Sequence, residues 1–156
     1  VDAYSREDSE IIENIRNINA IPLSIDDSLK VEVELEGVLY SPFSNSKIST
    51  EKLLSNSISE IENNTSLLFL AFQIFCSNSD ELSDLTQLQN WGFEVPITLR
   101  TDDPSQVKRW HSQWIKKELF SNLPTNGIVA KCNSSLTKNI LGVSQSSPNW
   151  ALALTR

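Results

Sequence analysis

Segments with the periodicity of strands alternate along this chain with segments that have the periodicity of helices. Apolar side chains at every second position are typical of a strand, and apolar side chains three or four positions apart are typical of a helix. Helices are predicted over 9–20, 49–63, 80–90, 104–120 and 134–141, and strands over 30–35, 67–76, 93–99, 127–132 and 150–154. This alternation favours a layered α/β fold with a largely parallel five-stranded sheet and flanking helices.

Two of these strands leave a second fold open. The strand over 30–35 alternates apolar residues with Glu32 and Glu34, and Glu36 continues the acidic face. Like charges on one face repel, so we expect that face to be exposed or to meet cationic groups. Pro96 lies inside the strand over 93–99, which favours an edge position. If both strands are antiparallel edges, the fold is instead an α+β sandwich.

Length and composition predict one globular domain over residues 1–156. The chain is 39% hydrophobic, and its longest apolar run, 67–72, is far too short to span a bilayer. It begins at Val1 and contains no Met, which predicts a product processed or excised from a larger protein. The net charge of −7 argues against nucleic acid as a partner of the whole surface. An intracellular location is favoured, and secretion stays open.

The sequence offers little for a cofactor or a metal ion. With four Gly, it contains neither a glycine-rich phosphate-binding loop nor a dinucleotide-binding fingerprint. One His and two Cys cannot build a Cys/His zinc site. Cys76 and Cys132 are expected to be free thiols, although a disulfide between them stays open. No cofactor and no metal site are therefore predicted.

Three aspartates carry the enzymatic alternative. Asp80, Asp102 and Asp103 follow predicted strands, so they could converge to bind a divalent cation or act as an acid–base pair. Aspartate just before a helix is also the usual N-cap, and Asp103 precedes Pro104 at the first helical position. The sequence favours capping.

The helix over 104–120 is the best candidate for an interaction site. Trp114 lies near the middle of its apolar arc and Trp110 at the margin, which predicts a core Trp114 and a half-exposed Trp110. His111 falls inside the arc and is expected to be a satisfied core imidazole. Lys108 and Lys117 flank the arc, and Arg109 and Lys116 lie opposite it.

These observations favour a non-enzymatic protein-interaction or scaffold domain, a subunit of a complex. Its interaction residues would be Trp110 with the basic residues of that helix, which would meet an acidic protein partner, and the acidic face of Glu32, Glu34 and Glu36. One alternative is a hydrolase or metal-dependent enzyme that uses the three aspartates. A second is contact with single-stranded nucleic acid through the basic Trp-bearing helix, although nucleic acid is disfavoured by the overall charge.

Overall fold

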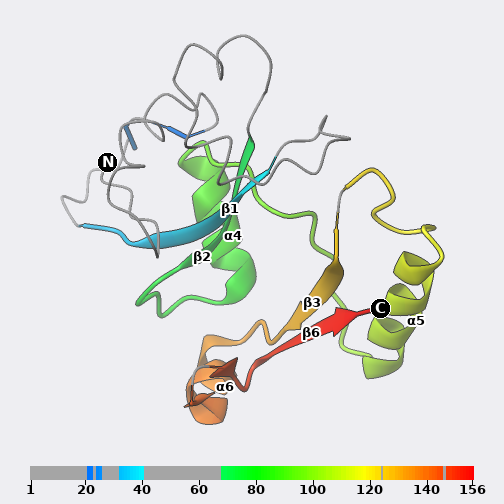
Figure 1. Ribbon diagram of the computed structural model, residues 1–156. Coiled ribbons are helices and arrows are strands. Elements are labelled where there is room, and N and C mark those ends of the chain that lie inside the picture. Colours follow the sequence, from blue (N-terminus) through cyan, green and yellow to red (C-terminus); the bar gives the residue numbers. More distant parts are fainter. Residues whose placement is uncertain (1–20, 23, 26–31, 41–67, 124, 146) are drawn as a thin grey trace, which may run out of the picture. The chain divides into compact units, whose positions relative to one another are not determined.

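The computed structural model describes residues 21–22, 24–25, 32–40, 68–123, 125–145 and 147–156 (Figure 1). The helices predicted over 9–20 and 49–63 lie outside these residues. The chain divides into two compact units, one formed by 1–76 with 85–96 and the other by 77–84 with 97–156. The single-domain expectation stays a prediction.

The first unit contains an antiparallel strand pair. β1 (Leu35–Tyr40) pairs with β2 (Leu68–Ile74), and the register shifts between Glu36 and Gly37. Gly37 is required at this bulge, because a Cβ atom there would lie 2.6 Å from the backbone carbonyl oxygen of Leu70. Glu32 and Glu34 precede the strand and are exposed, whereas Glu36 is half-buried.

Helix α4 (Glu81–Asn90) ends against this strand pair through a Schellman motif. Gly92 has φ +89°, its N–H donates to the Gln89 carbonyl, and the N–H of Phe93 donates to the Leu88 carbonyl. Leu88 and Phe93 are both buried, and the Phe93 ring meets Phe69 edge-on at 6.1 Å. The glycine thus allows the turn that places Phe93 in the core.

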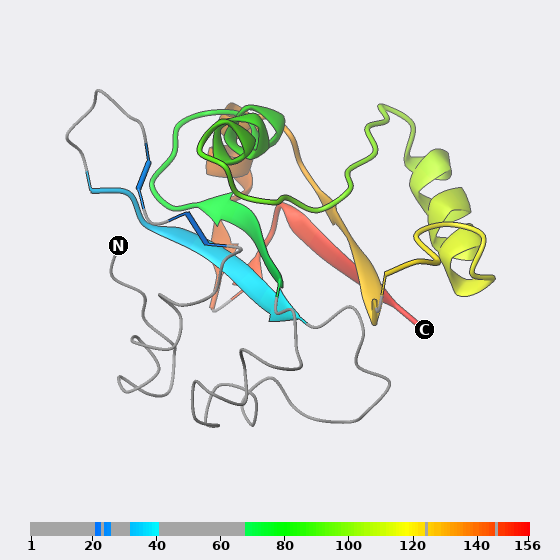
Figure 2. The same ribbon diagram turned by 90° about the horizontal axis from the view of Figure 1, so that it is seen from above.

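The second unit contains another antiparallel pair and two helices. β3 (Gly127–Lys131) pairs with β6 (Ala151–Thr155), and Figures 1 and 2 show the two strands side by side. α5 (Pro104–Ile115) precedes β3, and α6 (Ser135–Leu141) follows it. The short strands β4 (Val143–Ser144) and β5 (Ser147–Pro148) form a hairpin before β6.

The predicted α/β fold with a largely parallel sheet is wrong. The three strand pairs in the described residues are antiparallel, and the parallel contact there is an isolated bridge between Leu70 and Glu94. The predicted strand over 93–99 is not formed: the structure, which describes all of these residues, has the bridge at Glu94 and no strand over 95–99, and Pro96 lies two residues beyond the bridge. The α+β alternative with antiparallel strands fits better.

Candidate functional site

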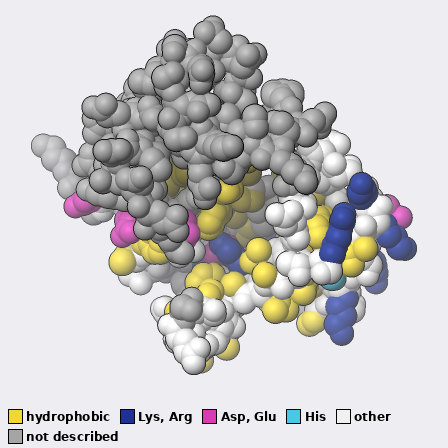
Figure 3. Space-filling model, viewed as in Figure 1, with side chains coloured by type: hydrophobic (Ala, Val, Ile, Leu, Met, Phe, Trp, Pro, Cys, Tyr) yellow, Lys and Arg dark blue, Asp and Glu magenta, His cyan; other side chains and the backbone are white. Residues whose placement is uncertain are grey.

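The four basic residues of the predicted helix over 104–120 form an exposed basic face on α5 and the turn that follows it. Lys108, Arg109, Lys116 and Lys117 are all exposed. Figure 3 shows Lys and Arg side chains gathered over the part of the molecule where α5 lies. Trp114 is only 4% exposed and Trp110 is half-buried, so the predicted difference between the two rings is confirmed.

Asp103 fixes the start of this helix. Its carboxylate accepts hydrogen bonds from the backbone N–H of Ser105 at 2.8 Å and from the Ser105 hydroxyl at 2.6 Å. The hydroxyl bond first, and then the backbone bond, lowers the pKa of Asp103 below its ordinary value of 3.8. The prediction that Asp103 is the N-cap of this helix is confirmed.

We expect Ser105→Ala to raise the pKa of Asp103 toward 3.8, because the variant loses the hydroxyl that favours the carboxylate. A lowered pKa in the folded state stabilises the fold above pH 3.8, and this contribution is lost as the pH falls through the folded pKa. An NMR titration of the Asp103 carboxyl measures the shift. Ser112→Ala, which alters an exposed serine bonded to Lys108 O, is the control and should leave this pKa unchanged. An equal pKa in wild type and Ser105→Ala would contradict the assignment.

The other aspartates do not join Asp103. The Asp80 carboxylate accepts the backbone N–H of Ser135 at the start of α6, 2.9 Å away, and Asp102 is exposed. Within the described ranges, no group of three His, Cys, Asp or Glu side chains could hold a metal ion. The hydrolase or metal-dependent centre built on these aspartates is therefore a wrong prediction.

Asp80 belongs instead to a pair of reciprocal caps between α4 and α6. The carbonyl of Asn133, just before α6, accepts the N–H of Glu81, and its side-chain oxygen accepts the N–H of Leu82 at 3.0 Å. Ser134 is the N-cap of α6, so Asn133 lies two residues before that helix. Each helix start therefore donates backbone N–H groups to the short segment that precedes the other helix. The sequence shows Asp80 as an N-cap residue but not the helix that it caps.

A charged cluster lies beside these caps. The Glu81 carboxylate accepts hydrogen bonds from Lys131 Nζ and Lys138 Nζ, each at 2.5 Å, and all three side chains are mostly buried. Lys138 Nζ also lies 5.0 Å from the centre of the Trp150 ring. We call Glu81, Lys131, Lys138 and Trp150 the Glu81 cluster. Sequence reasoning missed it, because the lysines lie 50 and 57 positions from Glu81.

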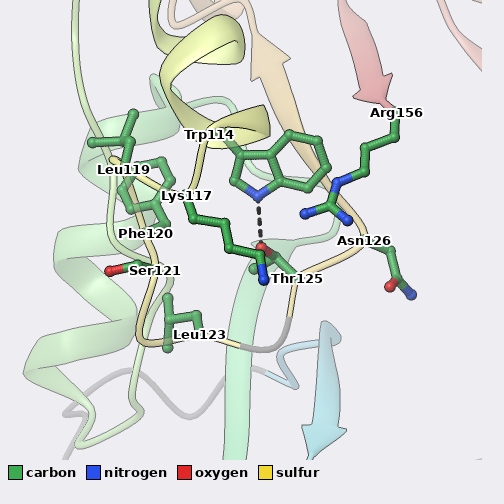
Figure 4. A pocket seen from close by; sticks show the side chains of 9 residues that line it. All are labelled: Trp114, Lys117, Leu119, Phe120, Ser121, Leu123, Thr125, Asn126 and Arg156. Carbon is green, nitrogen blue, oxygen red and sulfur yellow. Dashed lines mark hydrogen bonds between the residues drawn. The ribbon is translucent and has the colours of Figure 1, made fainter.

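A second feature is a pocket next to the C-terminal end of α5 (Figure 4). Its cavity volume is about 320 Å³. The Trp114 indole N–H donates to Thr125 Oγ1 at 2.8 Å, and Lys117 and Arg156 approach this hydrogen bond from two sides. The remaining described lining residues are Leu119, Phe120, Ser121, Leu123 and Asn126. We call this the Trp114 pocket; among its described lining residues two are cationic and none is acidic.

His111 holds the C-terminal end of β6 against α5. Its Nε2 lies 2.9 Å from the Thr155 carbonyl oxygen, and because a carbonyl can only accept, this nitrogen carries the proton. The His111 ring also stacks on Trp114, with 5.9 Å between centroids. His111 is hydrogen-bonded, as predicted, but it is half-buried and does not lie in the core as was expected.

The cysteines take no part in these sites. Cys76 is exposed, Cys132 is half-buried, and both are free thiols, as predicted.

Comparison with known proteins identifies a family for most of the chain. A family model for the NAD-dependent DNA ligase adenylation domain matches residues 30–155. A DNA ligase of Mycoplasma genitalium is 26% identical over 161 residues, covering 92% of this chain and 24% of the relative. DNA ligases of Cytophaga hutchinsonii (23% over 167 residues) and Prochlorococcus marinus (25% over 177 residues) cover 92% and 93% of this chain, and 25% and 26% of their own length. The chain thus spans about a quarter of the length of these relatives.

These matches overturn three expectations from the sequence. The predicted non-enzymatic interaction or scaffold domain is wrong, because the matched family is a domain of an enzyme. The prediction that the chain is not an enzyme is wrong for the same reason, and so is the prediction that nucleic acid is a disfavoured partner.

The helices in the part of the chain that the structure describes are too short or too polar to span a bilayer. The chain belongs to the NAD-dependent DNA ligase adenylation domain family.

Proposed function

We propose that this chain forms part of the adenylation domain of an NAD-dependent DNA ligase, with NAD as the adenylate donor and DNA as the final substrate. The family match over residues 30–155 is the observation that carries the proposal. An enzyme that seals cellular DNA works where that DNA is, so the proposal places the protein inside the cell.

The proposed reaction breaks the pyrophosphate bond of NAD. The AMP phosphorus bonds to a nucleophile, and nicotinamide mononucleotide leaves with the electron pair of the broken bond. In phosphoryl-transfer reactions a protein contributes mainly positioning and stabilisation of negative charge. Lys131 and Lys138 of the Glu81 cluster are the cations that we propose for this purpose.

The basic face is the proposed contact for the DNA backbone. Phosphate contacts by Lys and Arg supply most of the sequence-independent affinity for DNA, and Lys108, Arg109, Lys116 and Lys117 are exposed on this one helix and its C-terminal turn. Confining the cations to one face reconciles DNA contact with a chain of net charge −7. The half-buried Trp110 is proposed to support this face, and the glutamates 32, 34 and 36 stay a predicted interaction face.

The test is transfer of AMP from NAD to the purified protein. With NAD labelled in its adenylate phosphate, we expect label to stay covalently on the protein. NAD labelled in the nicotinamide ring should leave no label, and ATP with the same phosphate label should not substitute. Label from ATP but not from NAD, or from neither, would contradict the proposal.

A further inference from the structure

The Trp114 pocket brings two cations together without a carboxylate among its described lining residues. The Lys117 ammonium and the Arg156 guanidinium both reach toward the Trp114–Thr125 hydrogen bond (Figure 4). The two positive charges repel each other, and an anion bound between them would offset this repulsion. Thr125 Oγ1 already accepts from the indole, so its own hydroxyl proton can be donated to such an anion.

Two interactions at the C-terminal end of β6 position Arg156 at this pocket. Its guanidinium carbon lies 5.4 Å from the centre of the Trp114 ring, and the preceding residue, Thr155, is fixed by its carbonyl bond to His111. The guanidinium is planar, and its position over the indole restricts the direction of its N–H donors, whose fork geometry suits the oxygens of a phosphate.

The backbone at Lys117 is a second, independent observation. α5 ends in a Schellman motif: the Lys117 N–H donates to the Trp114 carbonyl and the Glu118 N–H to the Gln113 carbonyl, each at 2.9 Å. The residue in the left-handed position is Lys117, with φ +61°. α4 closes the same motif with Gly92, the residue that this conformation favours. Lysine in this conformation is strained where glycine would not be, and strained backbone of this kind often occurs at binding sites.

We propose that the Trp114 pocket binds a phosphate group through Lys117, Arg156 and the Thr125 hydroxyl. The inference rests on the proposed function only for the source of the phosphate, which is the DNA backbone or the pyrophosphate of NAD. Its chemistry is the same for both.

The experiment compares adjacent lysines. Lys117→Gln and Lys116→Gln remove the same charge one position apart, but Lys116 does not line the pocket. Binding of a fluorescently labelled nicked duplex is measured at several salt concentrations, and binding of NAD is measured in parallel. If the phosphate comes from DNA, Lys117→Gln and Arg156→Gln each weaken duplex binding about tenfold and lower the salt slope by about 1. Lys116→Gln loses one exposed contact of the basic face but leaves the pocket intact, so it should weaken duplex binding distinctly less than Lys117→Gln. NAD affinity should be unchanged in all three variants.

If the phosphate comes from NAD, the tenfold loss appears in NAD affinity and not in duplex binding. A further variant, Lys117→Gly, distinguishes a loss of binding from a loss of folded protein. Glycine relieves the left-handed strain, so we expect Tm to rise by about 2–4 °C while binding falls as in Lys117→Gln. A loss of binding in a more stable variant cannot come from unfolding.

The proposal is overturned if Lys117→Gln and Lys116→Gln weaken duplex binding equally and neither changes NAD affinity. In that case Lys117 only complements the partial negative charge at the end of α5. Titration with inorganic pyrophosphate separates this outcome from failure of the proposed function. Wild type that binds pyrophosphate more tightly than Lys117→Gln supports the pocket even if no AMP is transferred from NAD.

Discussion

Trp114→Ala is expected to lower the free energy of unfolding by about 3–5 kcal/mol, the largest effect of any substitution considered. The ring is 4% exposed, stacks on His111, and donates its N–H to Thr125. Removing it leaves a cavity and takes away the indole donor bonded to the threonine hydroxyl. Urea unfolding followed by circular dichroism measures the change.

Trp110→Ala is the matched control for this substitution. Trp110 lies on the same helix but is half-buried, so we expect a clearly smaller loss of stability. Equal losses for the two variants would show that the ring of Trp110 also anchors the core. A loss below about 1 kcal/mol for Trp114→Ala would contradict the packing described for α5.

Glu81→Gln is expected to cost about 2–3 kcal/mol of stability. It leaves two mostly buried ammonium groups, on Lys131 and Lys138, without the carboxylate that they share. This loss of stability is smaller than for a fully buried ion pair, because the three side chains are 14–21% exposed and water partly screens their charges. Chemical denaturation of wild type and variant measures the difference.

The control is Glu118→Gln, which removes one negative charge at an exposed position after α5 and should change stability by less than about 0.5 kcal/mol. A double variant, Glu81→Gln with Lys138→Gln, should be destabilised less than the sum of the two single variants, because each single change removes the same ion pair. Additive losses would show that Glu81 and Lys138 act independently.

Local signals in the sequence predicted local structure well. Asp103 and Pro104 fixed the start of α5, and the position of Trp114 on the helical wheel matched its burial. Gly92 marked the end of α4. In each case the cause lies within a few residues of the effect, so a single sequence contains it.

Interactions between distant parts of the chain could not be predicted in this way. Alternating apolar residues indicate a strand but not its partner or direction, so β3 and β6 were recognised as strands whereas their antiparallel pairing was not. The bond from Asp80 to Ser135 likewise joins residues 55 positions apart. The lack of a glycine-rich phosphate-binding loop argued against nucleotide binding through such a loop, but it does not bear on phosphate binding by other residues.

The exchange of caps between α4 and α6 makes the formation of one helix depend on the other. α6 has seven residues, and helices this short do not persist by themselves in water. The Ser135–Asp80 and Leu82–Asn133 hydrogen bonds both require the start of α4 to meet the segment before α6. The entropy of closing the intervening loop is therefore lost only once for the two sets of bonds. We therefore expect α6 and the first turn of α4 to fold and open as one cooperative unit, although about fifty residues separate them along the chain.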